Sequence, residues 1–320
     1  ARRCVHSRDV ASQRLNPDTM PLLQSITTHT AYIPGANNLG VILTGDGGAI
    51  TVDTGLDKDT GRMVRRALEE AGLRLRAIIS THHHADHIGG NDYLVRNLPG
   101  VAVYAPRLEA PFVENPLLEP IYLALGASPP AALRTKWLMA KGVPVDHLID
   151  GATVEIAGVT LEVVALPGHS LGQIGVAFDG VCFAADGFFG PDVLAKHGVP
   201  YAHDVAAQIA SLERLAARDE RFFLSGHGEL TLRDDLEATL RANRHAIERA
   251  TDAVRAALAE PGDILAIACR VQKALGLTIT GLPQYAIFAS AVAAHLSYLE
   301  AQGAATLTMT DEGAVWRGGS

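Results

Sequence analysis

Short apolar runs separated by turn residues make up the first part of the chain. Aliphatic and β-branched residues cluster over 24–30, 38–44 and 49–53, and Gly45-Asp46-Gly47-Gly48 separates the last two runs. Because glycine adopts the positive φ that tight hairpin turns require, this spacing predicts antiparallel strands joined by a hairpin.

The spacing of apolar residues changes to a helical period at Lys58. Apolar residues recur at helical intervals as far as Gly72, and a short apolar run then leads into a cluster of histidines. Glycine commonly ends helices, and a short apolar run between polar residues is typical of a buried strand. We therefore predict helix, strand, helix and strand over 58–72, 76–80, 88–97 and 101–105.

Residues 106–145 follow neither period. The segment holds seven prolines among many large apolar side chains. Because proline interrupts helices and sheets alike, we predict helical fragments without a place in a sheet, inserted over the core. Their apolar groups would pack on each other and on the sheet edge, form a dimer contact, or wall a substrate pocket.

Strand patterns resume after the insertion and then give way to helices. We predict strands over 153–156, 160–165, 172–178, 181–185 and 221–225, and a helix over 204–217. A helical stripe interrupted only by Asn243 follows over 236–258, and two more helices and a hairpin are predicted over 264–275, 284–302, 306–310 and 314–317.

The chain is therefore predicted to hold two folded parts. The first covers 20–230 and carries the insertion 106–145, and the second is a helical domain over 231–320. Residues 1–19 contain four arginines and no periodic pattern, so we expect a disordered extension or one left by processing or cloning.

Composition and charge narrow the class of protein. Hydrophobic residues form 48% of the chain and charged residues 19%, which is typical of a globular protein rather than a disordered one. With 27 basic and 35 acidic residues the formal net charge is −8, which disfavours binding to nucleic acid or to anionic lipid.

Cysteine usage and the lack of long apolar runs bear on the compartment. The three cysteines show no CxxC spacing, and no apolar run reaches the roughly 18 to 20 residues of a membrane span. We expect a cytoplasmic protein that does not enter the membrane and that acts on a small-molecule substrate.

The densest candidate chemistry is Thr81-His82-His83-His84-Ala85-Asp86-His87, directly after a predicted strand. A solvated loop is an alternative, but four histidines and an aspartate within six residues are hard to explain by packing. In an extended segment His82 and His84 lie on one side, whereas Asp86 and His87 begin the next turn. The spacing predicts two ligand pairs that face two metal positions.

One motif resembles the HxHxDH signature of the metallo-β-lactamase superfamily: His82-x-His84-x-Asp86-His87. The family's other ligands have counterparts in the same order near strand ends: His169, Asp186 and His227. The resemblance covers about residues 22–230. It implies an α/β fold, the αββα metallo-β-lactamase sandwich of two mixed sheets flanked by helices.

The same resemblance implies two metal ions that share one ligand. His82, His84 and His169 would hold the first ion. Asp86, His87 and His227 would hold the second, and Asp186 would bridge the two. Zinc is expected, with iron or manganese as alternatives, because neutral imidazoles suit borderline metals.

Two carboxylates, Asp86 and Asp186, are then the expected catalytic residues. Two metals lower the pKa of a shared water and so supply hydroxide at neutral pH. Asp53, in Val52-Asp53-Thr54-Gly55, matches a position near the metal loop and would orient a ligand or that loop. His83, between ligand positions, would point away from the metals.

Departures from the patterns of individual subfamilies restrict the activities that the sequence favours. Cysteine-bearing lactamases have Cys where this chain has Asp186, and Cys182 lies inside a predicted strand, where a buried small side chain is expected. Residues 84–91 are similar to glyoxalase II-like thioesterases, whose glutathione-binding basic residues have no counterpart here. Quorum-signal lactonases have tyrosine where this chain has Phe189.

The C-terminal part resembles the winged-helix tail of lactamase-like hydrolases that include a mitochondrial endoribonuclease. Residues 232–320 hold eight basic and ten acidic residues, whereas a domain that reads nucleic acid is normally basic. We therefore expect structural cover or a homodimer contact. His295 is expected on a helix face near the core.

These features predict a dinuclear metal-dependent hydrolase that uses metal-bridging hydroxide on small apolar esters, thioesters or lactones. The alternative is a phosphoesterase on the same site, either a phosphodiesterase, a phosphotriesterase or an endoribonuclease-like enzyme, because the same hydroxide serves phosphoryl centres. A non-hydrolytic diiron redox protein is disfavoured by the complete histidine set. The residues expected to contact substrate are Phe188, Phe189, Tyr201, His203 and Trp137.

Overall fold

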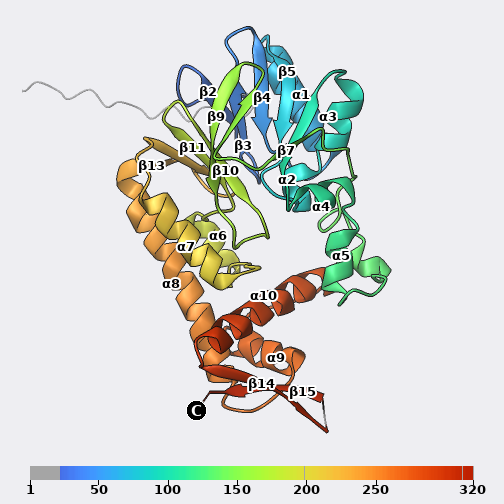
Figure 1. Cartoon of the computed structure of the whole chain (residues 1–320), viewed down its shortest axis with the longest axis vertical. Coiled ribbons are helices and arrows are strands. Elements are labelled where there is room, and N and C mark those ends of the chain that lie inside the picture. The colour runs from blue at the N-terminus through green and yellow to red at the C-terminus, as the bar shows by residue number, and fades with distance from the viewer. Residues whose placement is uncertain (1–21, 198, 312, 320) are drawn as a thin grey trace, which may run out of the picture.

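Two mixed β-sheets lie face to face, and helices cover their outer faces (Figure 1). The computed structural model describes residues 22–197, 199–311 and 313–319, so the extension predicted for 1–19 lies outside the described residues. The layers run helix, sheet, sheet, helix, which confirms the predicted α/β sandwich. A separate C-terminal helical part lies below the sandwich in Figure 1.

The first sheet has seven strands in chain order. They are β1 Gln24–Ser25, β2 Thr30–Ile33, β3 Leu39–Leu43, β4 Gly48–Val52, β5 Arg74–Ile79, β6 Ala102–Pro106 and β7 His147–Ile149. The pair β3–β4 is antiparallel, as predicted, the pair β2–β3 is also antiparallel although β2 was not predicted, and β4 to β7 are parallel. The prediction of one strand over 24–30 is wrong, because Thr27 and Thr30 form a hydrogen-bonded turn there.

The second sheet has six strands in the order β13-β12-β11-β10-β9-β8. They are β8 Thr153–Ile156, β9 Val159–Ala165, β10 Ile174–Phe178, β11 Val181–Ala185, β12 Phe222–Ser225 and β13 Thr231–Leu232. Only β11 and β12 run parallel. The parallel pair brings the ends of β11 and β12 to one edge.

Strand β11 shows how alternation builds the layers. Val181 and Phe183 pack in the cluster between the two sheets, whereas Cys182 and Ala184 pack on the outer helices. Successive side chains of a strand point to opposite faces, so a fully apolar strand must be covered on both. The prediction that Cys182 is a buried apolar residue is confirmed.

Three helices lie on or near the first sheet: α1 Lys58–Glu70, α2 Ala85–Ile88 and α3 Asn91–Asn97. Asp57 caps α1 by accepting hydrogen bonds from the backbone N–H groups of Asp59 and Thr60. The single helix predicted over 88–97 is divided at Gly89, where a Cβ atom would lie 1.8 Å from the Leu56 carbonyl oxygen. This close approach packs the turn after α2 against the segment that follows β4.

The insertion consists of short helices without a strand between residues 107 and 146, as predicted: α4 Ala110–Glu114, α5 Leu118–Leu123 and the 3-10 helix η2 Ala131–Leu133. The three-residue strand β7, which ends the segment, was not predicted. Val113 and Leu138 are buried, whereas Leu125 and Trp137 are 96% and 64% exposed. Only part of the apolar content is therefore covered within the chain.

The remaining helices connect the second sheet to the C-terminal part. They are α6 Pro191–His197, α7 Val205–Ala216, α8 Arg233–Ala257, α9 Ile264–Ala274 and α10 Leu282–Ala301, and β14 Ala305–Thr310 pairs with β15 Gly313–Gly318 in the predicted hairpin. No helix among the described residues combines the length and apolar character needed to cross a membrane.

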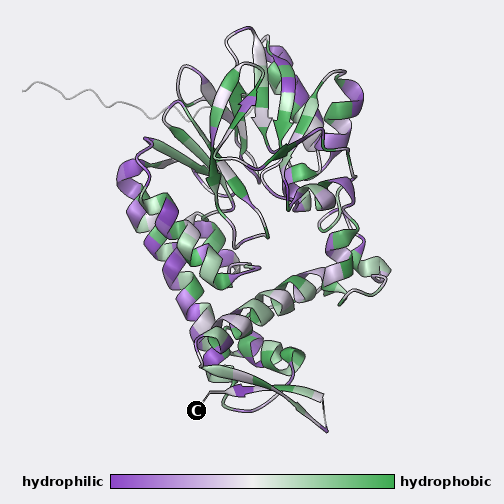
Figure 2. Ribbon diagram, in the orientation of Figure 1, coloured by the Kyte–Doolittle hydropathy of each residue, from purple (hydrophilic) through white to green (hydrophobic). Residues whose placement is uncertain are grey.

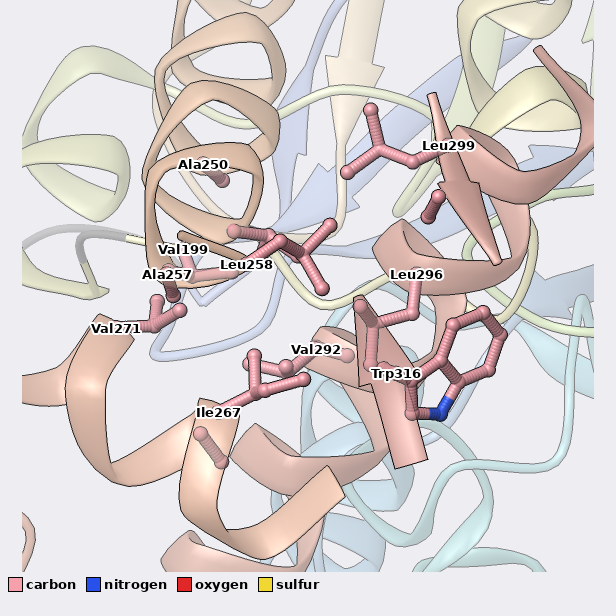
Figure 3. Packing of buried hydrophobic residues seen from close by; sticks show 14 of the residues in the cluster. Val199, Ala250, Ala257, Leu258, Ile267, Val271, Val292, Leu296, Leu299 and Trp316 are labelled. Atoms are coloured by element: carbon pink, nitrogen blue, oxygen red, sulfur yellow. The ribbon is translucent and has the colours of Figure 1, made fainter. Parts of the chain in front are cut away.

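Helix α8 belongs to two cores. Leu236, Leu240 and Ile247 pack with α7 on the second sheet, whereas Ala250 and Val254 pack with α9, α10 and the hairpin (Figure 3). Figure 2 shows hydrophilic and hydrophobic residues alternating along this helix. One continuous helix therefore joins the sandwich to the C-terminal part.

Helix α10 extends between the insertion and the C-terminal part, where it leads into β14 (Figure 1). It contacts α5 and η2, and Figure 1 shows it spanning the space below the sandwich. The lower edge of the two sheets thus faces the insertion on one side and the C-terminal helices on the other.

Candidate metal centre

Seven side chains from four segments converge at this edge. His82 and His84 follow β5, and Asp86 and His87 lie in α2. The other three follow β9, β11 and β12: His169, Asp186 and His227. Each strand ends at the same edge, which is why residues up to 145 positions apart in sequence meet.

One group of three nitrogens lies close together. His84 Nδ1 is 3.1 Å from His82 Nε2 and 2.9 Å from His169 Nε2. Zinc–nitrogen bonds of 2.0–2.1 Å in tetrahedral geometry place ligand atoms about 3.3 Å apart. The spacing of His82, His84 and His169 fits such a site.

A second group lies beside the first. His227 Nε2 is 3.3 Å from Asp86 Oδ2, and His87 Nε2 is 3.3 Å from Asp186 Oδ1. The other oxygen of Asp186 lies 3.2 Å from His169 Nε2 and 3.6 Å from His227 Nε2. Asp186 therefore faces members of both groups.

Hydrogen bonds on the far ring nitrogens determine which nitrogen faces inward. The Nδ1–H groups of His169 and His227 donate to the carbonyl oxygens of Tyr201 and Ala36, at 3.2 and 2.8 Å. His87 Nδ1–H donates to Asp53 Oδ2 at 2.8 Å. In each ring Nε2 is left to face the cluster, as in metal-bound histidines.

His82 is oriented through Thr81. The Thr81 hydroxyl donates to Asp53 Oδ2 at 2.8 Å, so it accepts from His82 Nδ1–H at 3.1 Å. Asp53 also accepts from the Thr81 backbone N–H at 2.8 Å. Asp53 thus orients His82 and His87 together, the role predicted for it, and it does so from a backbone with φ +63°.

The donor set fits metal cations. Three sets of ligand atoms each lie within 4.8 Å: His82, His84 and His169; His82, His87 and Asp186; and Asp86, His87 and His227. His87 Nε2 and Asp186 Oδ1 are buried and make no hydrogen bond. Buried polar atoms normally have partners, and clustered lone pairs repel one another, so a cation would satisfy both demands.

The two histidine groups differ in pKa. Burial, and then the neighbouring imidazoles, lowers the pKa of His82 and His84 well below the usual value. Burial also opposes charge on His87 and His227, but the Asp186 carboxylate and its neighbours outweigh it. They raise the pKa of His87 well above the usual range and that of His227 to about 9.

The pKa of the Asp186 carboxyl is lowered, whereas those of His87 and His227 are raised. Burial alone would raise the pKa of its carboxyl, but His227, His87 and His169 hold that pKa well below the usual range. A Cβ atom at Gly226 would lie 2.3 Å from Asp186 Oδ1, so no larger residue fits before His227. The carboxylate therefore stays ionised in a pocket shaped around it.

Glu109, in the insertion, is a residue that the sequence analysis missed. Its buried carboxylate pairs with His83 Nδ1 and accepts from the His83 backbone N–H at 3.1 Å. It also accepts from Ser170 Oγ at 2.8 Å and the Gly172 backbone N–H at 2.5 Å. His83 therefore turns away from the metal groups, and Glu109 ties the His82–His84 segment to the segment after His169.

The loop between β2 and β3 was also missed. Asn37 Nδ2 donates to Asp86 Oδ2 at 3.0 Å and lies 3.3 Å from His227 Nε2. Asn38 Nδ2 donates to the carbonyl oxygens of Ser225 and Gly228, at 3.0 and 2.7 Å. Single asparagines in a loop carry no periodic or motif signal, so only their position reveals this role.

Two of the five residues predicted to contact substrate, Phe189 and Tyr201, lie beside the candidate metal ligands. Phe189 packs against the rings of His169 and His227, with centroids 5.7 and 6.3 Å apart, and Tyr201 lies 5.5 Å from the ring of His84. Phe188 is instead 1% exposed in the core of the second sheet, a position that removes it from any substrate.

The structure does not bring His203 or Trp137 to the metal ligands. His203 is exposed, and Asp204 caps α7 by accepting from the Ala207 backbone N–H. Trp137 is 64% exposed with the Lys136 ammonium over its ring. Within the described part of the chain no hydrogen bond, ion pair or ring contact joins either residue to a metal ligand, and substrate contact stays a prediction for both.

Tyr122 and Glu119 of α5, which were not predicted as site residues, lie near the metal ligands. The hydroxyl groups of Tyr122 and Tyr201 lie 3.2 Å apart. Glu119 is 6% exposed, and burial together with the nearby Asp86 and Glu109 carboxylates raises its pKa well above the usual value. The insertion thus brings polar groups, as well as apolar cover, toward the metal edge, the edge of the two sheets at which the seven candidate ligands meet.

Residues 32–227, which include all seven candidate ligands, match the metallo-beta-lactamase superfamily. A hydroxyacylglutathione hydrolase of Aeromonas hydrophila is 29% identical over 195 residues, which cover 61% of this chain and 64% of the relative. A hydroxyacylglutathione hydrolase of Gloeobacter violaceus is 33% identical over 125 residues, covering 39% and 38%. The matches span less than two thirds of either relative.

Two solved structures resemble almost the whole chain. A beta-lactamase domain protein from Burkholderia ambifaria has a TM-score of 0.70 at 19% identity, with 94% of this chain and 96% of that chain covered. A metallo-beta-lactamase family protein from Thermus thermophilus has a TM-score of 0.65 at 22% identity, with coverage of 92% and 97%. The shared fold therefore includes helices beyond residue 227.

Proposed function

The chain belongs to the metallo-beta-lactamase superfamily, and on that premise we propose that it is a metal-dependent hydrolase that cleaves thioesters of small, uncharged acyl groups. One observation carries the proposal. Hydrogen bonds to the far nitrogens of His82, His87, His169 and His227 turn their Nε2 atoms toward the buried carboxylate of Asp186. Such an arrangement suits cation binding rather than packing.

Two divalent ions are proposed, with zinc favoured by the imidazole-rich donor set. His82, His84 and His169 would hold one, Asp86, His87 and His227 the other, and Asp186 would contact both. The ions would supply an acidified water and polarise the substrate carbonyl. The protein's own contribution is to hold the ligands in fixed orientation, which Asp53 and the backbone carbonyls do.

Two aromatic rings pack directly against ligand histidines. Phe189 packs on His169 and His227, and Tyr201, whose hydroxyl pairs with that of Tyr122, packs on His84 and His169. Apolar walls with a few hydroxyl groups favour an acyl group of low polarity and limit access of bulk water. The Tyr201 and Tyr122 hydroxyls are positioned as the hydrogen-bonding groups of this wall.

The described partners of the ligands include no arginine or lysine side chain that could recognise an anionic part of a substrate. Within the described residues, the ion pairs of the seven ligands join only histidines and carboxylates. Recognition of phosphate or of the carboxylates of glutathione normally uses arginine or lysine. The likeness to hydroxyacylglutathione hydrolases therefore supports thioester chemistry but leaves the glutathione part unmatched.

The test is a substrate panel on the zinc-loaded full chain. It compares kcat/KM for an aryl thioester with an uncharged thiol, a hydroxyacylglutathione, an aryl ester, a lactone and an aryl phosphodiester. The uncharged thioester is expected to rank first. Asp179→Ala, which removes an exposed carboxylate bonded to Thr27 and His29, is the control variant and should leave the ranking unchanged.

Two results would contradict the proposal. Higher kcat/KM for the phosphodiester than for every carbonyl substrate would assign the site to phosphoester hydrolysis. Preference for hydroxyacylglutathione over the uncharged thioester would show that the chain binds glutathione through residues other than those described here.

A further inference from the structure

Asn243 is a buried amide in the middle of the apolar stripe of α8. It is 3% exposed, and its helical neighbours Leu240 and Ile247 pack on the second sheet. A buried amide without partners is costly, so its hydrogen bonds indicate what it holds. Two of them reach outside the helix, and both go to one residue of the metal edge.

That residue is Phe189, three positions after Asp186. Asn243 Oδ1 accepts from the Phe189 backbone N–H at 2.8 Å, and Asn243 Nδ2 donates to the Phe189 carbonyl oxygen at 2.8 Å. Nδ2 also donates to the Thr239 carbonyl oxygen at 2.9 Å. Both hydrogens of the amide and its oxygen are therefore used, and the backbone of Phe189 is held on both sides.

The segment from Asp186 to Gly190 in turn touches the His227 loop. The Gly190 backbone N–H donates to the His227 carbonyl oxygen at 3.1 Å, and a Cβ atom at Gly228 would lie 3.1 Å from the Gly190 Cα. The Phe189 ring packs on His169 and His227. Displacing Phe189 would therefore disturb the bridging carboxylate and His227 together.

His227 is held partly by polar contacts, from Asn37 and Asp86 to its ring and from Ser225 to its backbone, but it is less enclosed than the ligand histidines that Asp53 orients. Its side chain is 21% exposed, and its far nitrogen is fixed only by the Ala36 carbonyl oxygen. His82, by contrast, is fully buried and oriented through Thr81. Loss of the contacts made through Phe189 should therefore weaken metal binding by Asp86, His87 and His227 more than metal binding by His82, His84 and His169.

We propose that Asn243 is a positioning residue for the metal centre. Its two hydrogen bonds to the backbone of Phe189 connect helix α8 to Asp186 and His227. Through this connection it helps to retain the metal ion held by Asp86, His87 and His227. The proposal rests on the metal-dependent function given above for the presence of the ions. Its test measures metal retention rather than turnover.

Three single variants of the full chain make the test. Asn243→Leu fills a similar volume without hydrogen bonds, and Asn243→Asp keeps the acceptor for Phe189 N–H but loses both donated bonds. Thr251→Val is the matched control, because Thr251 is also buried in α8 and its hydroxyl bonds Ile247 and His295 rather than the metal edge. Zinc retained per chain is measured against a graded series of chelator concentrations, with thermal unfolding of each metal-free variant alongside.

The Asn243→Leu chain is expected to keep one zinc as tightly as wild type and to lose the other at chelator concentrations roughly 10–100-fold lower, the range found when outer hydrogen-bond partners of metal ligands are removed. Asn243→Asp should show at least as large a loss, because its second carboxylate oxygen faces the carbonyl oxygens of Phe189 and Thr239, and Thr251→Val should lower thermal stability while retaining zinc as wild type does. Cobalt substitution should show an altered visible spectrum in both Asn243 variants but not in the control.

Wild-type retention of both ions by a folded Asn243 variant would overturn the proposal. Equal loss of zinc from Thr251→Val would also overturn it, because general loosening of α8 would then be the cause. If Asn243→Leu does not fold, the one-atom change Asn243→Asp decides in the same way. The zinc content of the wild-type chain alone tests the two-metal assignment, so the two ideas can fail separately.

Discussion

The two ligand groups of the metal centre are built in different ways. His82 and His169 are buried and His84 is half-buried, and burial lowers the pKa of each imidazole. The Asp86, His87 and His227 group mixes carboxylate with imidazole. It lies nearer the surface, with Asp86 and His227 side chains 33% and 21% exposed.

Their supports differ as well. The first group is tied together by Glu109 within the sandwich and its insertion. The second depends on the loop that carries Ala36 and Asn37 and, through Phe189, on Asn243 of the C-terminal helix. Two neighbouring sites that share one motif can therefore differ in robustness, because a residue of the C-terminal helix supports only the second of them.

The largest effect is expected at the residue that the two groups share. Asp186→Ala should lower kcat/KM by roughly three orders of magnitude, since several kcal/mol of metal-derived stabilisation is lost. The fold should persist, because the carboxylate contributes little apolar burial. Kinetics together with circular dichroism check this. Turnover near the wild-type level would contradict the bridging assignment, and Asp179→Ala serves as the exposed-carboxylate control.

Glu109→Gln should come next and should act on the first group. The amide that replaces the carboxylate presents hydrogens to groups that are themselves donors, so at least one of four contacts is lost at a cost of about 1–3 kcal/mol of stability. Zinc in the first group should bind roughly 10–100-fold more weakly.

Urea unfolding of the metal-free protein and chelator competition measure the two effects of Glu109→Gln separately. Glu114→Gln is a suitable control, because Glu114 is an exposed residue of the same insertion that accepts from the Val145 backbone N–H. Loss of stability without any loss of zinc would show that Glu109 only anchors the insertion.

Asn37→Ala should have a smaller effect, confined to the second group. It removes the 3.0 Å hydrogen bond to Asp86 Oδ2 from a half-buried loop, so zinc affinity there should fall about tenfold. Global stability should change by less than about 1 kcal/mol. Chelator competition with thermal unfolding tests this, and Asn97→Ala, at an exposed helical asparagine, is the control. Weaker binding in the first group instead would reverse the comparison.

The smallest effect on the metals is expected from His295, which joins α10 to α8 through Thr251 at 2.9 Å. Burial lowers the pKa of His295 to about 4. Between that value and the ordinary value near 6.5 the unfolded chain binds more protons, so stability rises with pH across this window and its contribution is constant above it. The accumulated difference is about 3 kcal/mol.

His295→Asn removes this titration while keeping a polar atom near Thr251. The pH dependence of the unfolding free energy between pH 4 and 6.5 should therefore flatten by about 3 kcal/mol relative to wild type. Zinc retention at neutral pH should not change, because the Asn243 contacts remain. An unchanged pH slope would show that His295 takes up its proton in the folded protein.

Local sequence was enough to identify the first four side chains that could bind metal, and the resemblance to a family supplied the other three. His82, His84, Asp86 and His87 form one short motif, and the strands that precede the other three candidate ligands are visible as local apolar runs. Local spacing decides which face of a strand end or turn a residue occupies, so the motif itself needed no knowledge of the fold, whereas His169, Asp186 and His227 were identified through the family's pattern of ligands. The alternation in β11 and the terminal hairpin followed from the same local rules.

What holds those ligands and what covers them depended on tertiary packing. Glu109, Asn37 and Tyr122 carry no pattern, and even Asn243, visible as a polar break in an apolar stripe, did not reveal its partner. Trp137 looked like a pocket wall and lies exposed. A hydrogen bond between residues 54 positions apart, such as that of Asn243 with Phe189, exists only because packing of α8 on the second sheet brings them together, and no local propensity encodes that distance.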